Sequence, residues 1–242
     1  MINYSEQRLS STFFLTQLKV LVLIAMGLLI SDWAFNDRLD LWLADQMFDA
    51  TTQQFPLKEH WFTVTIMHEW LKYLMVCLAM GLIALLIQQT HSTRPLLSNT
   101  QIANLKIIIS AAIILPLLIG TLKALSPIHC PWDLARYGGA ASEFIWGSGS
   151  SGGKCFPAGH VTSTSWLMAF TFVYLPLAKQ KARWVWLAAF SLAFMTGWVQ
   201  QLRGAHFLCH TLWSLWISWA VIVLLAYYFR GQRRVLNRFA TA

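Results

Sequence analysis

The chain has 242 residues, of which 57% are hydrophobic and only 12% are charged. Soluble domains carry about twice that share of charge, and their interiors have no room for so much apolar surface. The same figures exclude disordered, collagen-like and disulfide-scaffold proteins. Thirteen Trp, fifteen Phe and six Tyr suit a protein anchored at two membrane–water interfaces. The composition therefore predicts an integral membrane protein.

Six apolar stretches have the length of about 20 residues that a helix needs to cross a bilayer core. We expect spanning helices near residues 13–35, 69–88, 104–125, 158–177, 184–202 and 207–229. The fourth stretch begins with Gly, His, Thr and Ser, and polar groups at that depth usually face a bundle interior or a wet cavity. The sequence predicts an all-α bundle of six transmembrane helices, with residues 1–242 as one domain.

Lys and Arg residues set the expected orientation, because cytoplasmic loops are enriched in them. Six spans put both termini on one side, together with the basic residues at 179–183 and the basic tail at 230–238. We therefore expect cytoplasmic termini, with residues 36–68, 126–157 and 202–206 facing the outside. The net charge of +8 largely reflects that tail, which suits anionic headgroups. Nucleic acid is a poor partner, since no soluble basic domain exists to hold it.

Two outward segments differ from simple connectors. Residues 37–55 space their apolar residues roughly on one helical face, which predicts an amphipathic helix in the outer interface; a polar connector with a short helix fits as well. Residues 138–153 are rich in Gly and Ser and predict a flexible loop. A lid over a neighbouring site is one interpretation of that loop.

Three polar clusters stand at the outward ends of the expected helices. They are Lys123 with the following SPIHCPWDLAR, then KCFPAGH at 154–160, and RGAHFLCH at 203–210. Each has an ordinary explanation. Lys123 fits a snorkelling lysine, Pro157 a helix start, and two histidines four apart fit a metal pair, a catalytic pair or unrelated interior residues. Their common depth on one side of the membrane is the stronger signal.

Together the clusters supply two cations, two helix N-termini and histidines from two helices. Cations and N–H groups neutralise a phosphate, and most strongly in the transition state. One histidine can attack phosphorus while another protonates the leaving oxygen. The chain has neither the acidic cluster typical of a Mg²⁺ site nor a P-loop sequence. These residues predict phosphoryl transfer without a metal or other cofactor.

The motifs resemble those of the type 2 phosphatidic acid phosphatase (PAP2) family, K-x6-R-P, P-S-G-H and S-R-x5-H-x3-D. Here they read Lys123 to Cys130-Pro131, Pro157-Ala158-Gly159-His160, and Gln200 to His206 and His210, within residues 100–230. The resemblance implies a six-helix fold with its active site at the outer interface. It further implies that His206 is the nucleophile, that His160 is the general acid, and that Lys123 with the backbone of Ala158 and Gly159 holds phosphate.

Several positions depart from the family pattern. Cys130 and Gln200 stand where the motifs have arginines, so two bidentate phosphate ligands are missing from their expected places. Our hypothesis is that Arg136 and Arg203 supply them from new positions. Ala158 replaces the motif serine and loses one hydroxyl donor.

His210 replaces the aspartate that orients the nucleophile. A neutral imidazole still accepts the His206 N–H but brings no negative charge, so we expect activity to persist to lower pH. Asp133 or Glu143 is an alternative source of the missing carboxylate.

Cys130 and Cys155 both lie on the outward side, where an oxidising compartment permits a disulfide between the first two motifs. Zinc held by Cys209 with His206 and His210 is the competing use of these residues. Cys77 lies in the second span and is expected to be packed.

The resemblance implies a metal-independent lipid phosphatase that works through a phosphohistidine. Short loops, the small size of the chain and the outward-facing motifs favour a bacterial-type inner membrane, with the site facing the periplasm. Compatible substrates are lipid A, phosphatidic acid, phosphatidylglycerol phosphate and undecaprenyl pyrophosphate, and no residue decides among them. A lipid phosphotransferase of the same family and a degenerate binding or transport protein are the alternatives. The oligomeric state stays open.

Overall fold

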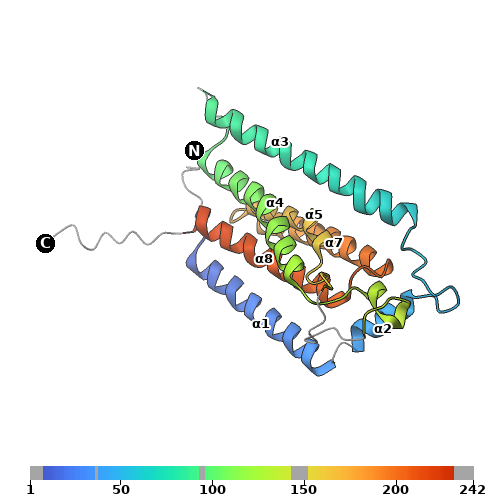
Figure 1. The fold of residues 1–242 in the computed structure, drawn as a ribbon. Coiled ribbons are helices and arrows are strands. Elements are labelled where there is room, and N and C mark those ends of the chain that lie inside the picture. Colours follow the sequence, from blue (N-terminus) through green and yellow to red (C-terminus); the bar gives the residue numbers. More distant parts are fainter. Residues whose placement is uncertain (1–7, 36–37, 93–95, 143–151, 232–242) are drawn as a thin grey trace.

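The computed structural model describes residues 8–35, 38–92, 96–142 and 152–231, and these residues form an all-α fold without a β-sheet. The long helices are α1 (Ser11–Phe35), α3 (Leu71–His91), α4 (Asn99–Leu125), α7 (Lys179–Leu202) and α8 (Leu208–Arg230). A π-helical segment, η1 (Phe62–Trp70), runs directly into α3. Figure 1 shows these helices side by side. The all-α prediction is confirmed.

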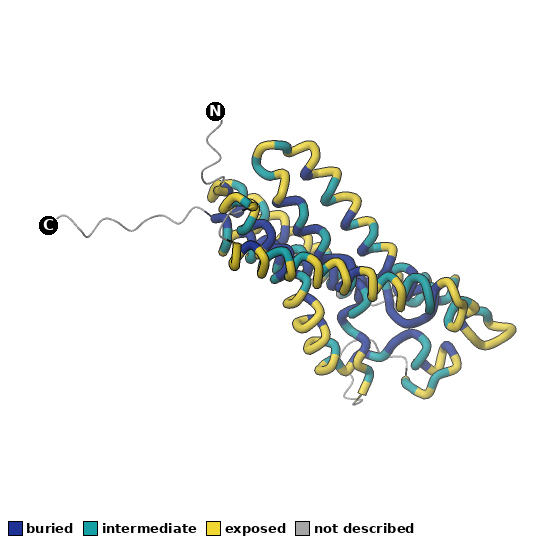
Figure 2. Tube along the Cα trace, turned by 90° about the horizontal axis from the view of Figure 1, so that it is seen from above, coloured by how far each residue is buried: buried dark blue, intermediate teal, exposed yellow. Residues whose placement is uncertain are grey.

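Within the described residues, five helical stretches are long and apolar enough to cross a membrane. They are Ser11–Asp32, Phe62–His91, Asn99–Leu125, Lys179–Leu202 and Leu208–Arg230. Each matches one of the apolar stretches in the sequence, and the second begins earlier than expected because η1 continues α3. Many apolar residues of α1 and α3 are exposed, as expected for a surface that faces lipid. Figure 2 marks exposed residues along the chain in yellow. The protein therefore has the character of a membrane protein.

The fourth expected stretch, at 158–177, forms no continuous α-helix. Residues 159–174 alternate between 3-10 and α geometry, as η4 (Gly159–Val161), α5 (Thr162–Ser165), η5 (Trp166–Phe170) and α6 (Thr171–Tyr174). Side chains compete here with the helical hydrogen bonds, since the hydroxyl of Thr162 donates to the Gly159 carbonyl and that of Ser163 to the His160 carbonyl. The segment packs against α4, α7 and α8. It is the centre of the bundle, which explains its polar beginning.

The main core lies around this central segment. Met168 and Phe172 are fully buried, as are Ile107 and Leu115 of α4 and Ile222 of α8. The buried Arg230 at the end of α8 donates to the carbonyls of Phe172 and Leu175, over 2.6 Å and 2.9 Å. These bonds satisfy carbonyls that the end of α6 leaves without helical partners. Apolar packing and this arginine together fix the central segment.

The two ends of the bundle differ in what they carry. At one end, the Leu9 N–H donates to the Arg230 carbonyl, so the start of α1 meets the end of α8. The other end carries α2 (Arg38–Met47) and the residues that follow α4 (Figure 1). There the Trp132 N–H donates to the Gly204 carbonyl. Gly204 has φ +72°, and a Cβ on it would lie 2.3 Å from the Phe55 ring, so this turn requires glycine.

The amphipathic segment is helical over a shorter range than 37–55. Helix α2 ends at Met47, and mutual backbone hydrogen bonds between Asp49 and Gln54 close a turn after it. The apolar face of α2 packs on protein, because Ala44 is buried in a cluster with Phe55, Tyr137 and other residues. Trp42 stays exposed. Of the proposed lid, residues 143–151 lie outside the described residues.

A disulfide joins Cys130 to Cys155 across 25 positions of sequence, between the first two motifs. Neighbouring backbone bonds reinforce this link: the N–H groups of Lys154 and Cys155 donate to the carbonyls of Ser126 and Ile128. The segment that follows α4 is therefore held against the segment that precedes His160.

Replacing both cysteines with alanine should lower the free energy of unfolding by about 3 kcal/mol, since a loop of this length then regains its freedom in the unfolded chain. Chemical denaturation in detergent measures the change, and Cys77→Ala is the control that keeps the disulfide. An unchanged midpoint in the double variant would contradict a stabilising role.

Candidate functional site

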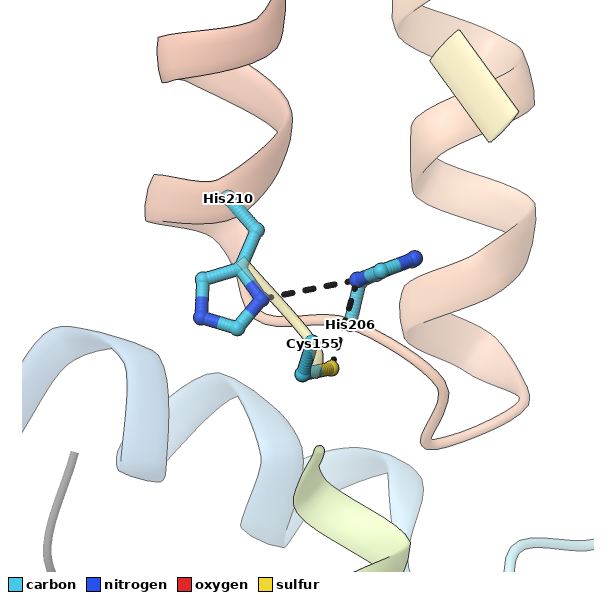
Figure 3. A group of neighbouring side chains, drawn as sticks. All are labelled: Cys155, His206 and His210. Carbon is cyan, nitrogen blue, oxygen red and sulfur yellow. Dashed lines mark hydrogen bonds between the residues drawn. The ribbon is translucent and has the colours of Figure 1, made fainter. Parts of the chain in front are cut away.

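Three histidines from two parts of the chain form a contiguous row. His206 lies between the other two, with its Nε2 3.3 Å from His160 Nδ1 and its Nδ1 3.4 Å from His210 Nδ1. Figure 3 shows His206 and His210 facing one another beside Cys155. His206 and His210 are almost without solvent exposure. The row brings together the histidines that the sequence predicts as catalytic.

The row depends on the turn between α7 and α8. His206 lies in that turn, and His210 lies on the first turn of α8. Asp40 of α2 caps this helix, because its Oδ1 accepts the Cys209 N–H over 3.1 Å. The Ala158 N–H donates to the His210 carbonyl over 3.3 Å, which ties the second motif to the third. The positions of His160 and His206 are therefore set by contacts between distant segments.

Hydrogen bonding restricts how protons are arranged along the row. If His206 Nδ1 donates to His210, its Nε2 carries a lone pair and accepts from His160 Nδ1. This tautomer of His206 is the nucleophilic one, with Nε2 free to attack once a substrate displaces the His160 contact. His210 Nε2 is then protonated, and it is a buried atom without a hydrogen-bond partner among the described residues. His210 thus occupies the orienting position without supplying a carboxylate.

A pocket of about 390 Å³ opens beside His160. Its polar end is lined by Lys123, Gly159 and His160, and also by His68 and Lys72 from η1 and α3. The Lys123 side chain lies over Gly159, with its Cδ 3.8 Å from the place that a Cβ there would take. The pocket therefore concentrates positive charge and histidine next to the row.

The rest of the pocket is mostly apolar, apart from Thr162 and Ser163, and extends between α3, α4 and the central segment. Its lining there includes Met75, Val76, Ala79, Ala112 and Trp166. A cavity with one cationic end and one apolar end matches a ligand that has an anionic head and a hydrocarbon tail.

Arg203 is buried beside the site and donates to three acceptors. Its Nε donates to the Lys58 carbonyl over 3.0 Å, and one terminal nitrogen (Nη1) lies 3.0 Å from Gln200 Oε1 and 3.4 Å from His68 Nδ1. Gln200 stands at the motif position of an arginine, so the guanidinium of Arg203 reaches that place from three residues later. Its contact with the pocket runs through His68.

Two predicted phosphate ligands are engaged elsewhere. Arg136 forms a bidentate ion pair with Asp45 of α2, with N–O distances of 2.8 Å and 2.7 Å. The hydrogen bonds from Arg136 lower the pKa of the Asp45 carboxyl. Burial, and then the hydrogen bond that the Tyr137 hydroxyl donates to Asp45, raise the pKa of that hydroxyl. The Ala158 N–H is occupied by His210. We therefore leave Arg136 and the Ala158 amide out of the phosphate site.

The two candidate replacements for the motif aspartate have different outcomes. Asp133 Oδ2 accepts the Cys130 N–H over 3.2 Å and so closes the short turn at Pro131. Glu143 lies outside the described residues. Asp133 therefore serves the local turn, while His210 is the residue in contact with His206.

The structure brings together a different set of possible zinc ligands from the predicted set. Cys155, not Cys209, lies with His206 and His210 in a group whose ligand atoms are all within 4.8 Å. Cys209 instead faces Asp40 at the start of α8. Zinc binds thiolate sulfur, whereas the Cys155 sulfur is bonded to Cys130. Two histidines alone fall short of the three protein ligands that catalytic zinc sites use.

Sequence analysis missed His68, Lys72 and Asp40. Lys72 lies within the apolar stretch expected at 69–88, where ionisable residues usually mark functional sites, so its signal was available, and His68 directly precedes that stretch. Asp40 gave no such signal, because its role as a cap for α8 depends on a contact across 169 positions of sequence.

Comparison with known proteins identifies the family. The family model described as PAP2 superfamily matches residues 104–234, which is more than half of the chain. The chain belongs to the PAP2 superfamily. No curated protein and no solved structure matches it significantly. Membership in the PAP2 superfamily indicates phosphatase-type activity, and the matched residues include all three motifs and the histidine row.

Burial lowers the pKa of His206 well below its ordinary value of 6.5, and the neighbouring His160, His210 and Lys123 lower it further. The unfolded chain takes up a proton here as the pH falls through 6.5, whereas the folded chain does not. Folding stability should therefore decline below that pH, while His206 stays neutral.

Nitrogen NMR of the ring in detergent tests this expectation, with His206→Gln used to assign the signal. We expect the neutral form of His206 to persist at pH 5.5, about one pH unit below the ordinary histidine pKa. A midpoint near the ordinary value would show that the ring is solvated.

Proposed function

We propose that this protein is a metal-independent lipid phosphatase that hydrolyses a phosphomonoester or pyrophosphate of an amphipathic lipid through a phosphohistidine. The observation that carries the proposal is the row of His160, His206 and His210 beside a pocket with one cationic and one apolar end. Superfamily membership supports phosphatase chemistry. The pocket supports a substrate with a hydrocarbon tail, such as lipid A, phosphatidic acid, phosphatidylglycerol phosphate or undecaprenyl pyrophosphate.

The proposed reaction begins when the phosphate displaces the His160–His206 contact and lies between the two rings. Lys123 neutralises its oxygens, and the bound dianion favours the imidazolium form of His160. The Nε2 lone pair of His206 forms a bond to phosphorus while the bond to the leaving oxygen breaks. His160 gives its proton to that oxygen, which leaves as a lipid alcohol or a lipid phosphate.

Water completes the reaction. The neutral His160 takes a proton from a water molecule as its oxygen attacks phosphorus, and the bond between phosphorus and His206 Nε2 breaks. Inorganic phosphate leaves, and His206 is restored. Throughout, His210 Nδ1 accepts the His206 Nδ1–H and holds the ring in the reactive tautomer.

We further propose that the central segment, residues 159–174, completes a six-span bundle in a bacterial-type inner membrane. The basic residues near the termini favour a cytoplasmic location for both ends. The histidine row lies where α7 turns into α8, near α2 and opposite the end where α1 meets α8 (Figure 1). With cytoplasmic termini the site opens towards the periplasm, which agrees with a disulfide at its edge.

Phosphate release by the purified protein in detergent tests the proposed function. The substrates are phosphatidic acid, phosphatidylglycerol phosphate, lipid A, undecaprenyl pyrophosphate and a short-chain analogue of each head group, all with EDTA present. We expect release from at least one long-chain lipid, weaker release from its short-chain analogue, and no loss with EDTA.

The matched variants are His206→Ala and His160→Ala. The first should lower kcat by about 10⁴-fold or more, as for other covalent nucleophiles, and the second by about 10²–10⁴-fold. Activity that disappears with EDTA would refute the metal-free mechanism. Release that requires a second lipid as acceptor would instead identify a phosphotransferase.

His210→Asp should restore the family carboxylate and raise the pKa of His206, because a negative charge beside the ring favours imidazolium. The acidic limb of the pH–kcat profile should then move to higher pH, while His210→Leu should lower kcat at every pH. An unshifted profile in His210→Asp would show that this position does not act on the nucleophile.

A further inference from the structure

His68 lies outside the three family motifs but directly against the histidine row. Its ring meets that of His160 edge to face, with centroids 4.6 Å apart. It also lines the polar end of the pocket with Lys123 and Lys72. His68 belongs to η1, and π-helical geometry is rare and frequent at functional sites. His68 therefore lines the pocket, lies against the His160 ring and belongs to a segment with unusual backbone geometry.

The contact with Arg203 determines which nitrogen of His68 carries the proton. A guanidinium has only donors, so its Nη1, 3.4 Å from His68 Nδ1, must donate to that nitrogen. Nδ1 of His68 is then an acceptor, and the neutral ring carries its proton on Nε2. The second ring nitrogen is thus a hydrogen-bond donor held beside the cationic end of the pocket.

This arrangement places the guanidinium of Arg203 beside Gln200, the position at which the family motif has an arginine. The Gln200 side chain accepts from Arg203 over 3.0 Å, and the same guanidinium nitrogen contacts His68. Arg203 is held a third time by the Lys58 carbonyl, so its side chain has little freedom. Because Arg203 donates these hydrogen bonds to protein acceptors, it acts on the pocket through His68, the ring that it orients.

We propose that His68 is a further substrate-contacting residue, which donates a hydrogen bond from Nε2–H to a phosphoryl oxygen, and that Arg203 is its positioning residue. The assignment rests on the proposed phosphatase function. A fixed neutral donor stabilises the charge that develops on the phosphoryl oxygens and, unlike an imidazolium, loses nothing when the pH rises. This donor replaces part of the stabilisation of the phosphoryl oxygens that the missing motif arginines would provide.

Substitutions at position 68 test whether the residue is needed and also which of its two ring nitrogens is needed. The amide nitrogen of glutamine reaches roughly the place of Nε2, whereas that of asparagine reaches roughly the place of Nδ1. His68→Phe should lower kcat by about 10²-fold, the loss typical of one preorganised donor. His68→Gln should recover most of this loss, and His68→Asn should not. His91→Phe, at the exposed far end of α3, is the matched control.

The role of Arg203 is tested by a double-mutant cycle. If Arg203 acts through His68, then Arg203→Met and His68→Phe together should cost little more than His68→Phe alone. Additive losses would overturn the positioning role. Equal losses in His68→Gln, His68→Asn and His68→Phe would overturn the donor role, and wild-type kcat in His68→Phe would do the same.

A second readout separates this inference from the proposed function. Orthovanadate, an analogue of the phosphoryl group, should raise the unfolding temperature of the wild-type protein and of His68→Gln, and raise it less in His68→Phe and His68→Asn. This pattern without lipid hydrolysis would support the donor and refute the phosphatase. Hydrolysis with an equal vanadate shift in all variants would support the phosphatase and refute the donor. If the protein shows no hydrolysis and no vanadate shift, both the phosphatase function and the donor role of His68 are refuted.

Discussion

The site depends on one constraint, which is that polar rings buried in an apolar bundle must hydrogen-bond to one another. His206 has almost no contact with solvent, so its two nitrogens find partners within the protein: Nε2 lies 3.3 Å from His160 Nδ1, and Nδ1 lies 3.4 Å from His210 Nδ1 and 3.5 Å from Cys155 Sγ. Each of these rings is in turn held by backbone: the His210 carbonyl accepts the Ala158 N–H, and the disulfide fixes the segment before His160. An unpaired imidazole at this depth would cost free energy, so the row and the fold stabilise each other.

The substituted motif residues are compatible with this arrangement because the site depends on the positions of hydrogen-bond donors in space, and other positions of the sequence can supply such donors. Arg203 reaches the place of the motif arginine beside Gln200 and contacts His68 there. His210 Nδ1 lies 3.4 Å from His206 Nδ1, the distance of a hydrogen bond, although it brings no negative charge. Arg136 lies near the first motif in the sequence, yet its bidentate pair with Asp45 uses it to hold α2. Two arginines that each lie near a motif in the sequence therefore have different roles.

The central segment shows how polarity and position are linked. Its hydroxyl groups and His160 would be costly in a helix that faces lipid, and they are tolerated because α4, α7 and α8 surround it. The same hydroxyls bond to nearby carbonyls and divide the segment into short 3-10 and α pieces. Hydropathy alone predicted the fourth of six spanning helices here. Burial among neighbouring helices is what allows the segment to place His160 inside the bundle.

The sequence by itself determined the all-α membrane character, the approximate helices and the motif histidines, because apolar length and residue spacing are local properties. Tertiary structure alone decided which groups meet: His68 and Arg203 lie 135 positions apart in the sequence, and Asp40 caps α8 across 169 positions. It also decided that Cys155 lies with His206 and His210, and that the Ala158 amide is occupied. Such contacts depend on how helices pack and turn, and no pattern along a single stretch of chain records the distance between two side chains.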